Sequence, residues 1–157
     1  MKKPWNLINV PIYSLATYQE GVVNMNICNY VSAVSMQPKK YMIAIDSASK
    51  TFENLLHNDL VVLQLLHENQ FNLVKKLGNE SGKNTDKHAY LHKKDGLETW
   101  EGFTVLKNPS ARLLLRRETH IPSGDHTLFL FEILKYKVYD ANCLTLDILR
   151  EKKLVRI

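Results

Sequence analysis

The stretch Asn24–Thr51, NMNICNYVSAVSMQPKKYMIAIDSASKT, decides how the rest of the chain is arranged. Its first part, Asn26–Ser35, is an uncharged run of small polar and β-prone residues. After Pro38 and two lysines comes the apolar run Tyr41–Ile45, which stops at an aspartate and has the pattern of a buried strand. The stretch therefore predicts two strands, and Pro38 ends the first of them.

Asp46–Thr51, DSASKT, follows the buried strand and leads into an amphipathic helix predicted over Lys50–Asn58. The free backbone N–H groups and the positive dipole end at a helix N-terminus suit a phosphate, and three hydroxyls and one lysine add donors here. The same residue types are also the preferred N-caps, which a helix needs in any case. The segment by itself is compatible with a phosphate site and with a plain helix cap.

Length and composition indicate a single domain over residues 1–157, with 45% apolar and 24% charged residues. No apolar run approaches the roughly 20 residues that span a bilayer, and no signal-peptide core follows the N-terminal lysines, so we expect a cytoplasmic protein without a membrane partner. Cys28 and Cys143 form no C-x-x-C pair and are predicted to be reduced structural thiols. The net charge of +5 favours anionic partners, but the basic residues are dispersed as short pairs, so nucleic acid is not expected.

The apolar and β-prone runs predict a mainly β domain, a β-barrel with two or three helices. The predicted strands are Ile12–Tyr18, a long strand from Val22 to Ser35, Tyr41–Ile45, Leu60–Leu66 and Thr127–Tyr139, with a turn at Gln19–Gly21. Leu60–Leu66 is nearly all apolar, which is typical of a central strand.

The other segments are predicted less regularly. A second helix is expected over Asn69–Leu77, with Gly78 as its C-cap, followed by a mobile loop over Asn79–Thr85. The pattern leaves Asp86–Gly102 unassigned and allows either strand or helix over Ser110–Glu118. Short closing elements are expected at Leu144–Leu149 and Leu154–Ile157.

Several familiar chemistries are not indicated. The sequence lacks the G-x-G-x-x-G and P-loop patterns of nucleotide sites and the G-x-S-x-G elbow of hydrolases. His88 and His92 are four residues apart, but three nearby lysines disfavour a cation, so no metal site is predicted. Gly124-Asp125-His126 places an imidazole at the start of a strand, where it could meet a ligand or merely close the turn.

Taken in order, these segments resemble the flavin reductase-like family of FMN-binding split-barrel proteins. The resemblance rests on Asn29–Pro38 with its V-S-x-x-P ending, Tyr41–Thr51, Val61–Leu66, Asp86-Lys87 and Gly124-Asp125-His126. It covers nearly the whole chain and implies the split-barrel fold. Lys39 replaces a second proline that often follows Pro38, and Asn24 and Asn26 stand where smaller residues are common.

The resemblance also implies roles for individual residues. The isoalloxazine ring of FMN would be lined by Asn26, Ile27, Cys28, Asn29 and Tyr30, with Asn29 hydrogen-bonding its pyrimidine edge. The ribityl phosphate would be held by Ser47, Ser49, Lys50 and Thr51, with added charge from Lys87. His126 is the catalytic candidate, facing the flavin or the reductant. FAD is an alternative flavin, and members of the family are usually homodimers with the flavin near the interface.

The function that the resemblance implies is NAD(P)H-dependent flavin reduction, with hydride passing from the nicotinamide to flavin N5. Because the cofactor does this chemistry, no acid–base pair or nucleophile is needed. Reduced flavin would then serve a partner monooxygenase, oxygen, a quinone or another protein. An FMN-binding protein for electron transfer, storage or sensing, without reductase turnover, is the alternative. Without the resemblance, a small basic barrel that binds nucleic acid with steep salt dependence is a third hypothesis.

Overall fold

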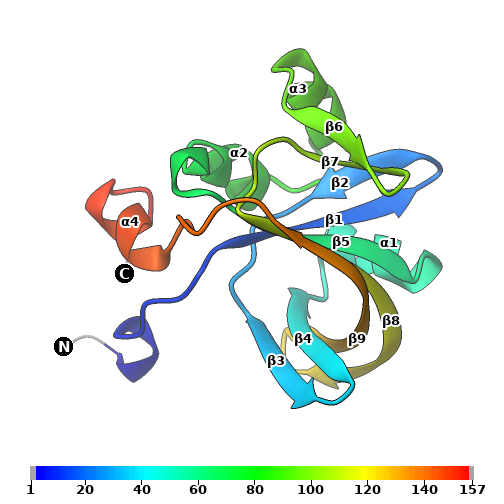
Figure 1. Ribbon diagram of the computed structural model, residues 1–157. Coiled ribbons are helices and arrows are strands. Elements are labelled where there is room, and N and C mark those ends of the chain that lie inside the picture. The colour runs from blue at the N-terminus through cyan, green and yellow to red at the C-terminus, as the bar shows by residue number, and fades with distance from the viewer. Residues whose placement is uncertain (1–2, 156–157) are drawn as a thin grey trace.

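The computed structural model describes residues 3–155, which fold mainly as β-structure around one large antiparallel sheet (Figure 1). The strands of this seven-stranded sheet stand in the order β2-β1-β5-β8-β9-β4-β3. Their bounds are β1 Tyr13–Gln19, β2 Val22–Met25, β3 Val31–Met36, β4 Lys39–Asp46, β5 Leu60–Leu65, β8 Ala111–Ser123 and β9 His126–Val138. A separate hairpin consists of β6 Leu97–Trp100 and β7 Phe103–Leu106.

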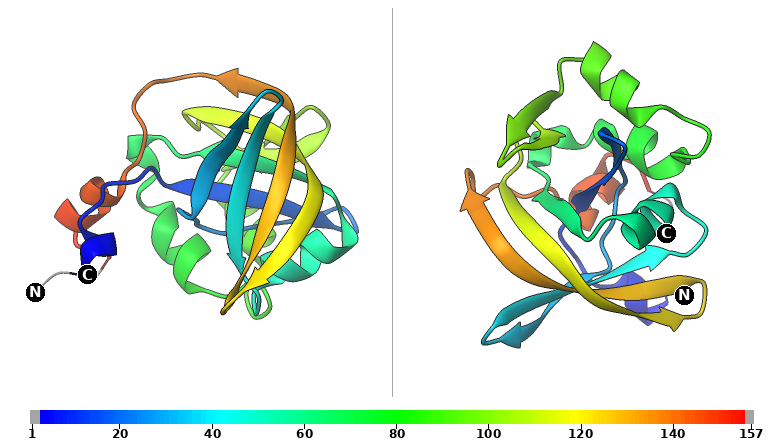
Figure 2. Two further views of the ribbon diagram at one scale, coloured as in Figure 1. Left: turned by 90° about the horizontal axis from the view of Figure 1, so that it is seen from below. Right: turned by 90° about the vertical axis from the view of Figure 1, so that its right-hand side faces the viewer.

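Within the described residues there are four α-helices, not two or three. They are α1 Lys50–His57, α2 Leu73–Asn79, α3 Lys87–Lys93 and α4 Leu146–Glu151, with 3-10 turns at Pro4–Asn6 and Glu68–Gln70. Helix α4 lies beside the N-terminal turn (Figures 1 and 2), and its Leu149 is buried in the same core cluster as Ala16 of β1 and Val62 of β5. Arg150 Nη2 donates to the Asn6 carbonyl at 2.6 Å, which joins the two ends of the described chain. No helix within residues 3–155 has the length and apolar character to cross a bilayer.

The central strands β1 and β5 are covered on both faces. In β5, Val61 and Leu63 pack with Phe129 and Phe131 inside the curled sheet, whereas Val62 packs into a second cluster on the opposite face. A strand buried on both faces is expected to be apolar at every position rather than at alternate ones. The central position predicted for Leu60–Leu66 is therefore confirmed.

The two edges of the sheet are joined by the connector Asn26–Tyr30. Strands β2 and β3 are consecutive in sequence but stand at opposite ends of the sheet. Within the connector, Cys28 exchanges two backbone hydrogen bonds of 2.9 and 2.8 Å with Tyr13 of β1, and the Tyr30 carbonyl accepts from Ala44 N–H of β4 at 2.9 Å. These bonds tie both ends of the sheet together and curl it into a barrel (Figure 2).

Two predicted elements are wrong in their extent. The long strand from Val22 to Ser35 is broken at Asn26–Tyr30, because the chain must cross from one end of the sheet to the other there. The helix predicted over Asn69–Leu77 is split into the 3-10 turn Glu68–Gln70, which has a capping box with His67, and α2.

Gly78 is not a C-cap, since α2 continues through it to Asn79. A Cβ added at Gly78 would lie 3.2 Å from Ile27 Cβ, so the glycine lets the helix approach the connector closely. The ambiguous Ser110–Glu118 segment is strand β8, and the unassigned Asp86–Gly102 segment forms α3 and part of the β6–β7 hairpin. The predicted closing element Leu144–Leu149 is helix α4; of the one predicted at Leu154–Ile157, the last two residues lie outside the described part of the chain.

Candidate functional site

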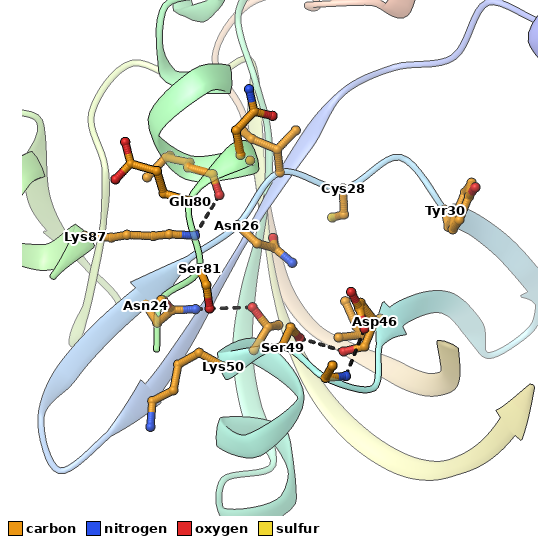
Figure 3. Close-up of a pocket in the computed structure, with 18 of the residues that line it drawn as sticks. Asn24, Asn26, Cys28, Tyr30, Asp46, Ser49, Lys50, Glu80, Ser81 and Lys87 are labelled. Atoms are coloured by element: carbon orange, nitrogen blue, oxygen red, sulfur yellow. Dashed lines mark hydrogen bonds between the residues drawn. The ribbon is translucent and has the colours of Figure 1, made fainter. Parts of the chain in front are cut away.

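A cavity of about 590 Å³ lies between two walls that come from different parts of the chain (Figure 3). The strand wall consists of Asn24, Asn26–Tyr30, Ala44–Asp46 and Ala48–Thr51, and the loop wall of Leu77–Gly82 and Lys87. His126, the first residue of β9, also lines the cavity. The volume falls within the roughly 300–1,000 Å³ that small-molecule and cofactor sites usually have.

The N-terminal end of α1 faces this cavity and is only partly capped. Ser49 is the N-cap, and its hydroxyl accepts from Phe52 N–H at 3.1 Å. The backbone N–H groups of Lys50 and Thr51 find no acceptor among residues 3–155. Two free N–H groups at the positive end of a helix suit a phosphate oxygen, so the Ser49 cap leaves donors with which an anion could bind.

Thr51 and Asn24 form a buried polar contact at the base of the cavity. Thr51 is 1% exposed, and its hydroxyl oxygen accepts from Asn24 Nδ2 at 3.2 Å. Gly82 of the loop wall lies directly on this pair, since a Cβ added to it would stand 2.1 Å from Asn24 Oδ1. The two walls are therefore in direct contact here, and the contact leaves no room for a side chain at residue 82.

The side-chain amide of Asn26 has a fixed orientation. Its Oδ1 accepts from Leu15 N–H at 3.0 Å, so the two hydrogens on Nδ2 remain free and point into the cavity (Figure 3). No residue in the described part of the chain accepts from them. An amide donor held in this way suits a carbonyl oxygen of a ligand.

Lys87 supplies a buried cation to the loop wall. The residue is 4% exposed, and its Nζ donates to the Leu77 carbonyl at 2.7 Å, close to the end of α2. Burial lowers the pKa of Lys87 from 10.5 to about 8, and the nearby Glu80 carboxylate opposes this shift. An ammonium has three donors, so Lys87 can fix the loop wall and still meet an anion in the cavity.

His126 and Tyr30 stand together at the cavity, with ring centroids 5.4 Å apart. His126 Nδ1 lies 2.6 Å from Asp125 Oδ1, and this contact holds the pKa of the Asp125 carboxyl below its ordinary value. Because Nδ1 is engaged, Nε2 is the ring nitrogen left for a ligand. Cys28 is a free thiol whose pKa is raised to about 12 by burial, so it lines the cavity in the protonated form.

Most residues predicted for the site line one cavity, but two of the predicted phosphate ligands are turned elsewhere. Ser47 does not line the cavity, and its hydroxyl shares a 2.9 Å hydrogen bond with Thr127. Lys50 lines the cavity, yet its side chain runs away from it (Figure 3), and Nζ donates to Gln19 Oε1 at 2.7 Å.

The loop wall was not found from the sequence, except for Lys87. Its signal is the pair of glycines in GNESG, residues 78–82, which lie in or beside the segment predicted to be a mobile loop. Glycines in a polar segment are read as flexibility, although each of these two permits a close approach to the strand wall, at Ile27 and at Asn24.

The model of the flavin reductase like domain matches residues 5–147. This chain belongs to that family. None of the curated proteins matches it significantly in sequence.

Solved structures agree with this assignment at the level of the fold. An FMN-binding protein from Thermus thermophilus with bound 1-cyclohex-2-enone has a TM-score of 0.77 at 19% identity, over 88% of this chain and 75% of that chain. The styrene monooxygenase flavin reductase SMOB from Pseudomonas putida S12 has a TM-score of 0.75 at 18% identity, over 88% and 86%. The NADH:FAD oxidoreductase SgcE6 from Streptomyces globisporus C-1027, in complex with NAD and FAD fragments, has a TM-score of 0.77 at 16% identity, over 88% and 81%. The predicted fold class, a mainly β single-domain split barrel, is confirmed.

Proposed function

We propose that this protein is an NAD(P)H-dependent flavin reductase that binds FMN in the 590 Å³ cavity. The observation that carries the proposal is the presence, in one cavity, of two unpaired backbone N–H groups at Lys50 and Thr51 and of the free amide donors of Asn26. These are the donors that a phosphate and a ring carbonyl need. A flavin held there would supply the redox chemistry, as the acceptor of a hydride from reduced nicotinamide.

The residues then have separate binding roles. The N–H groups of Lys50 and Thr51 hold the phosphate, with Ser49 and Thr51 fixing the helix end and Lys87 adding positive charge. The ring is lined by Asn26, Ile27, Cys28, Asn29 and Tyr30, with donors from Asn26 and Asn29 toward its pyrimidine edge. His126 Nε2 is placed to meet the flavin or the nicotinamide. Ser47 is left out of the proposed phosphate site because its hydroxyl is bonded to Thr127.

The reductant and the acceptor are supported by the chain's relatives. One structural neighbour is named as an NADH:FAD oxidoreductase, and another as the flavin reductase of a styrene monooxygenase. By analogy, reduced flavin would pass from this protein to a partner monooxygenase. The cytoplasmic location expected from the sequence stays a prediction.

We also propose a homodimer. Strand β9 exposes Leu134, Tyr136 and Val138, at 39%, 71% and 69%, beside a second cavity of about 800 Å³. An apolar strip of this kind is typical of a protein–protein interface. Light scattering after gel filtration tests this, and a mass near 18.2 kDa at micromolar concentration would contradict it.

The function is tested first by the absorption spectrum of the desalted protein, with FMN added if it is colourless, and then by anaerobic addition of NADH or NADPH. We expect flavin bands and their bleaching within seconds to minutes. Bands without bleaching by either nucleotide would favour the electron-transfer or storage alternative. If the protein took up neither FMN nor FAD, both the flavin reductase proposal and the electron-transfer or storage alternative would be contradicted.

The phosphate site is tested by comparing FMN with riboflavin. We expect FMN to bind at least about tenfold more tightly, because charge-assisted hydrogen bonds are worth roughly 1.5–3 kcal/mol. Lys50→Pro removes one of the two backbone N–H donors at the first position of α1, where proline is tolerated, and should remove much of this preference. Lys50→Ala, which keeps both N–H groups, and Ser47→Ala are the matched controls and should keep it. An unchanged preference in Lys50→Pro would refute the phosphate assignment.

A further inference from the structure

Three residues close the 590 Å³ cavity at the end that adjoins the start of α1. Asn24, Lys50 and Gly82 line this cavity and also a smaller one of about 370 Å³, so they form the partition between the two. A Cβ added to Gly82 would lie 2.1 Å from Asn24 Oδ1 and 3.0 Å from Lys50 Cβ. The partition is therefore packed too tightly for a further chain of atoms to pass through it.

The loop that carries Gly82 runs from α2 to α1. On one side, Glu80 Oε2 lies 2.8 Å from Lys76 Nζ of α2. On the other side, Lys83 Nζ lies 3.0 Å from Glu53 Oε1 of α1. The loop therefore covers the start of α1, and Gly82 is the residue at which it meets the strand wall.

The cavity is deep at the partition and open at its opposite end. Asn24, Thr51 and Lys87 are 8%, 1% and 4% exposed, whereas Tyr30 at the other end is 60% exposed (Figure 3). The free N–H groups of the α1 terminus belong to the deep end, because one of them is that of Thr51 itself. A ligand whose phosphate binds these groups must therefore enter the cavity with the phosphate first.

The charges at the deep end suit one phosphate group. Two lysines line the cavity, but the side chain of Lys50 runs away from it (Figure 3), and its Nζ lies 3.4 Å from Glu53 Oε2. The ammonium of Lys87 and the two free N–H groups thus remain for an anion. A second phosphate would meet the Glu80 carboxylate, which lines the same cavity, and like charges repel each other.

We propose that the partition makes this protein selective for FMN over FAD, with Asn24 and Gly82 as the residues that determine the selectivity. This inference rests on the proposed function. FMN ends in its phosphate and can enter the deep end with that group first. In FAD the same phosphate is joined to a second phosphate and to adenosine, which would run against the partition where one added carbon already overlaps Asn24. Rejection of a competing ligand by a clash is a common source of specificity.

The selectivity is tested with dissociation constants for FMN and for FAD that has been freed of FMN. We expect the unsubstituted protein to bind FMN at least about tenfold more tightly than FAD, a difference that one clash is enough to produce. Asn24→Ala removes the amide that contacts Gly82, so the ratio of the FAD constant to the FMN constant should fall at least about threefold. Asn84→Val, at an exposed position of the same loop and outside both cavities, is the matched control and should keep the ratio.

Gly82→Val opens the partition from the other side and keeps the test independent of Asn24→Ala, should that variant fold poorly. The added side chain moves the loop wall away from Asn24, so FMN loses more affinity than FAD and the ratio again falls. Binding of FAD as tight as that of FMN by the unsubstituted protein would overturn the inference while leaving the flavin site intact. An unchanged ratio in the correctly folded variants would overturn it as well. Failure of the unsubstituted protein to bind any flavin would instead contradict the proposed function.

Discussion

The two walls of the 590 Å³ cavity are built in different ways. The strand wall is held by regular structure, since its residues belong to the barrel connector, to β4 and to the start of α1. The loop wall is held by single contacts: Gly82 on Asn24, Gly78 on Ile27, and the Lys87 ammonium on the Leu77 carbonyl. One wall is thus fixed by the barrel itself, and the other can be loosened by one substitution at a time.

The largest effect is expected from Gly82→Val. Its Cβ would stand 2.1 Å from Asn24 Oδ1, so the loop wall must move or the Asn24–Thr51 hydrogen bond must break. Overpacking of this kind typically costs about 1–3 kcal/mol, and we expect the dissociation constant for FMN to rise roughly 10- to 100-fold. Asn84→Val, in the same loop but exposed, is the control for a fluorescence titration. Normal FMN affinity in Gly82→Val would show that the walls need not touch.

The strand wall is tested by Asn26→Asp compared with Asn26→Ala. Aspartate keeps the acceptor for Leu15 N–H and loses the donors that point into the cavity, whereas alanine loses both. We expect about tenfold weaker FMN binding for both variants, and a loss of about 1–3 kcal/mol in the free energy of unfolding for alanine alone. Urea unfolding measures the free energy of unfolding, and FMN titration measures the dissociation constant. Equal stability of the two variants would mean that the Leu15 contact does not fix the amide.

The charge on the loop wall should make binding depend on pH. The pKa of Lys87 is about 8, so the ammonium is lost as the pH rises from 7 to 9, and FMN affinity should fall several-fold over that range. Riboflavin, which has no phosphate, should show no such fall, and Lys87→Met should bind FMN weakly at every pH. In the free protein, the unfolded chain binds more protons between pH 8 and 10.5, so this lysine makes stability rise with pH there. If the FMN affinity of the unsubstituted protein did not change with pH, Lys87 would not contribute to binding of the phosphate.

The smallest effect is expected from Lys83→Ala. Lys83 Nζ lies 3.0 Å from Glu53 Oε1 and links the loop to α1, but both side chains are more than 40% exposed. Ion pairs in water contribute little, so FMN affinity should change less than about threefold. A larger change would mean that the loop wall is held in place by the exposed Lys83–Glu53 ion pair and not by its buried contacts.

The strand wall could be predicted from the sequence because most of its residues lie close together along the chain. Asn24–Thr51 contains the connector, β4 and the start of α1 in one stretch, so its motif places most of the wall at once. The loop wall depends on which distant surfaces the two glycines approach, and a single sequence does not contain that information. For the same reason, the direction of the Lys50 side chain could not be foreseen: Gln19, its partner, lies on a strand placed beside α1 only by the fold.

The two hairpin turns show a second reason why some elements could not be predicted from the sequence. The β1–β2 hairpin turns at Glu20-Gly21 with φ values of 51° and 77°, and the β6–β7 hairpin turns at Glu101-Gly102 with φ values of 51° and 82°. Both hairpins have the same dipeptide and backbone conformation. The first was predicted because β-prone runs flank it on both sides. The second was missed because the mostly polar stretch before it, from Asp86, shows no strand pattern, although Trp100 and Phe103 stand directly beside the turn.

The connector that closes the barrel has a consequence for how the protein can be monitored. Cys28 and Tyr13 exchange backbone hydrogen bonds where the two ends of the sheet meet, and the same connector lines the 590 Å³ cavity. The cavity therefore exists only while the barrel is closed, and a ligand in it protects that seam. The amide protons of Tyr13 and Cys28 report this directly: their exchange with deuterium in solvent should slow when FMN is added, more than that of the exposed β3–β4 hairpin.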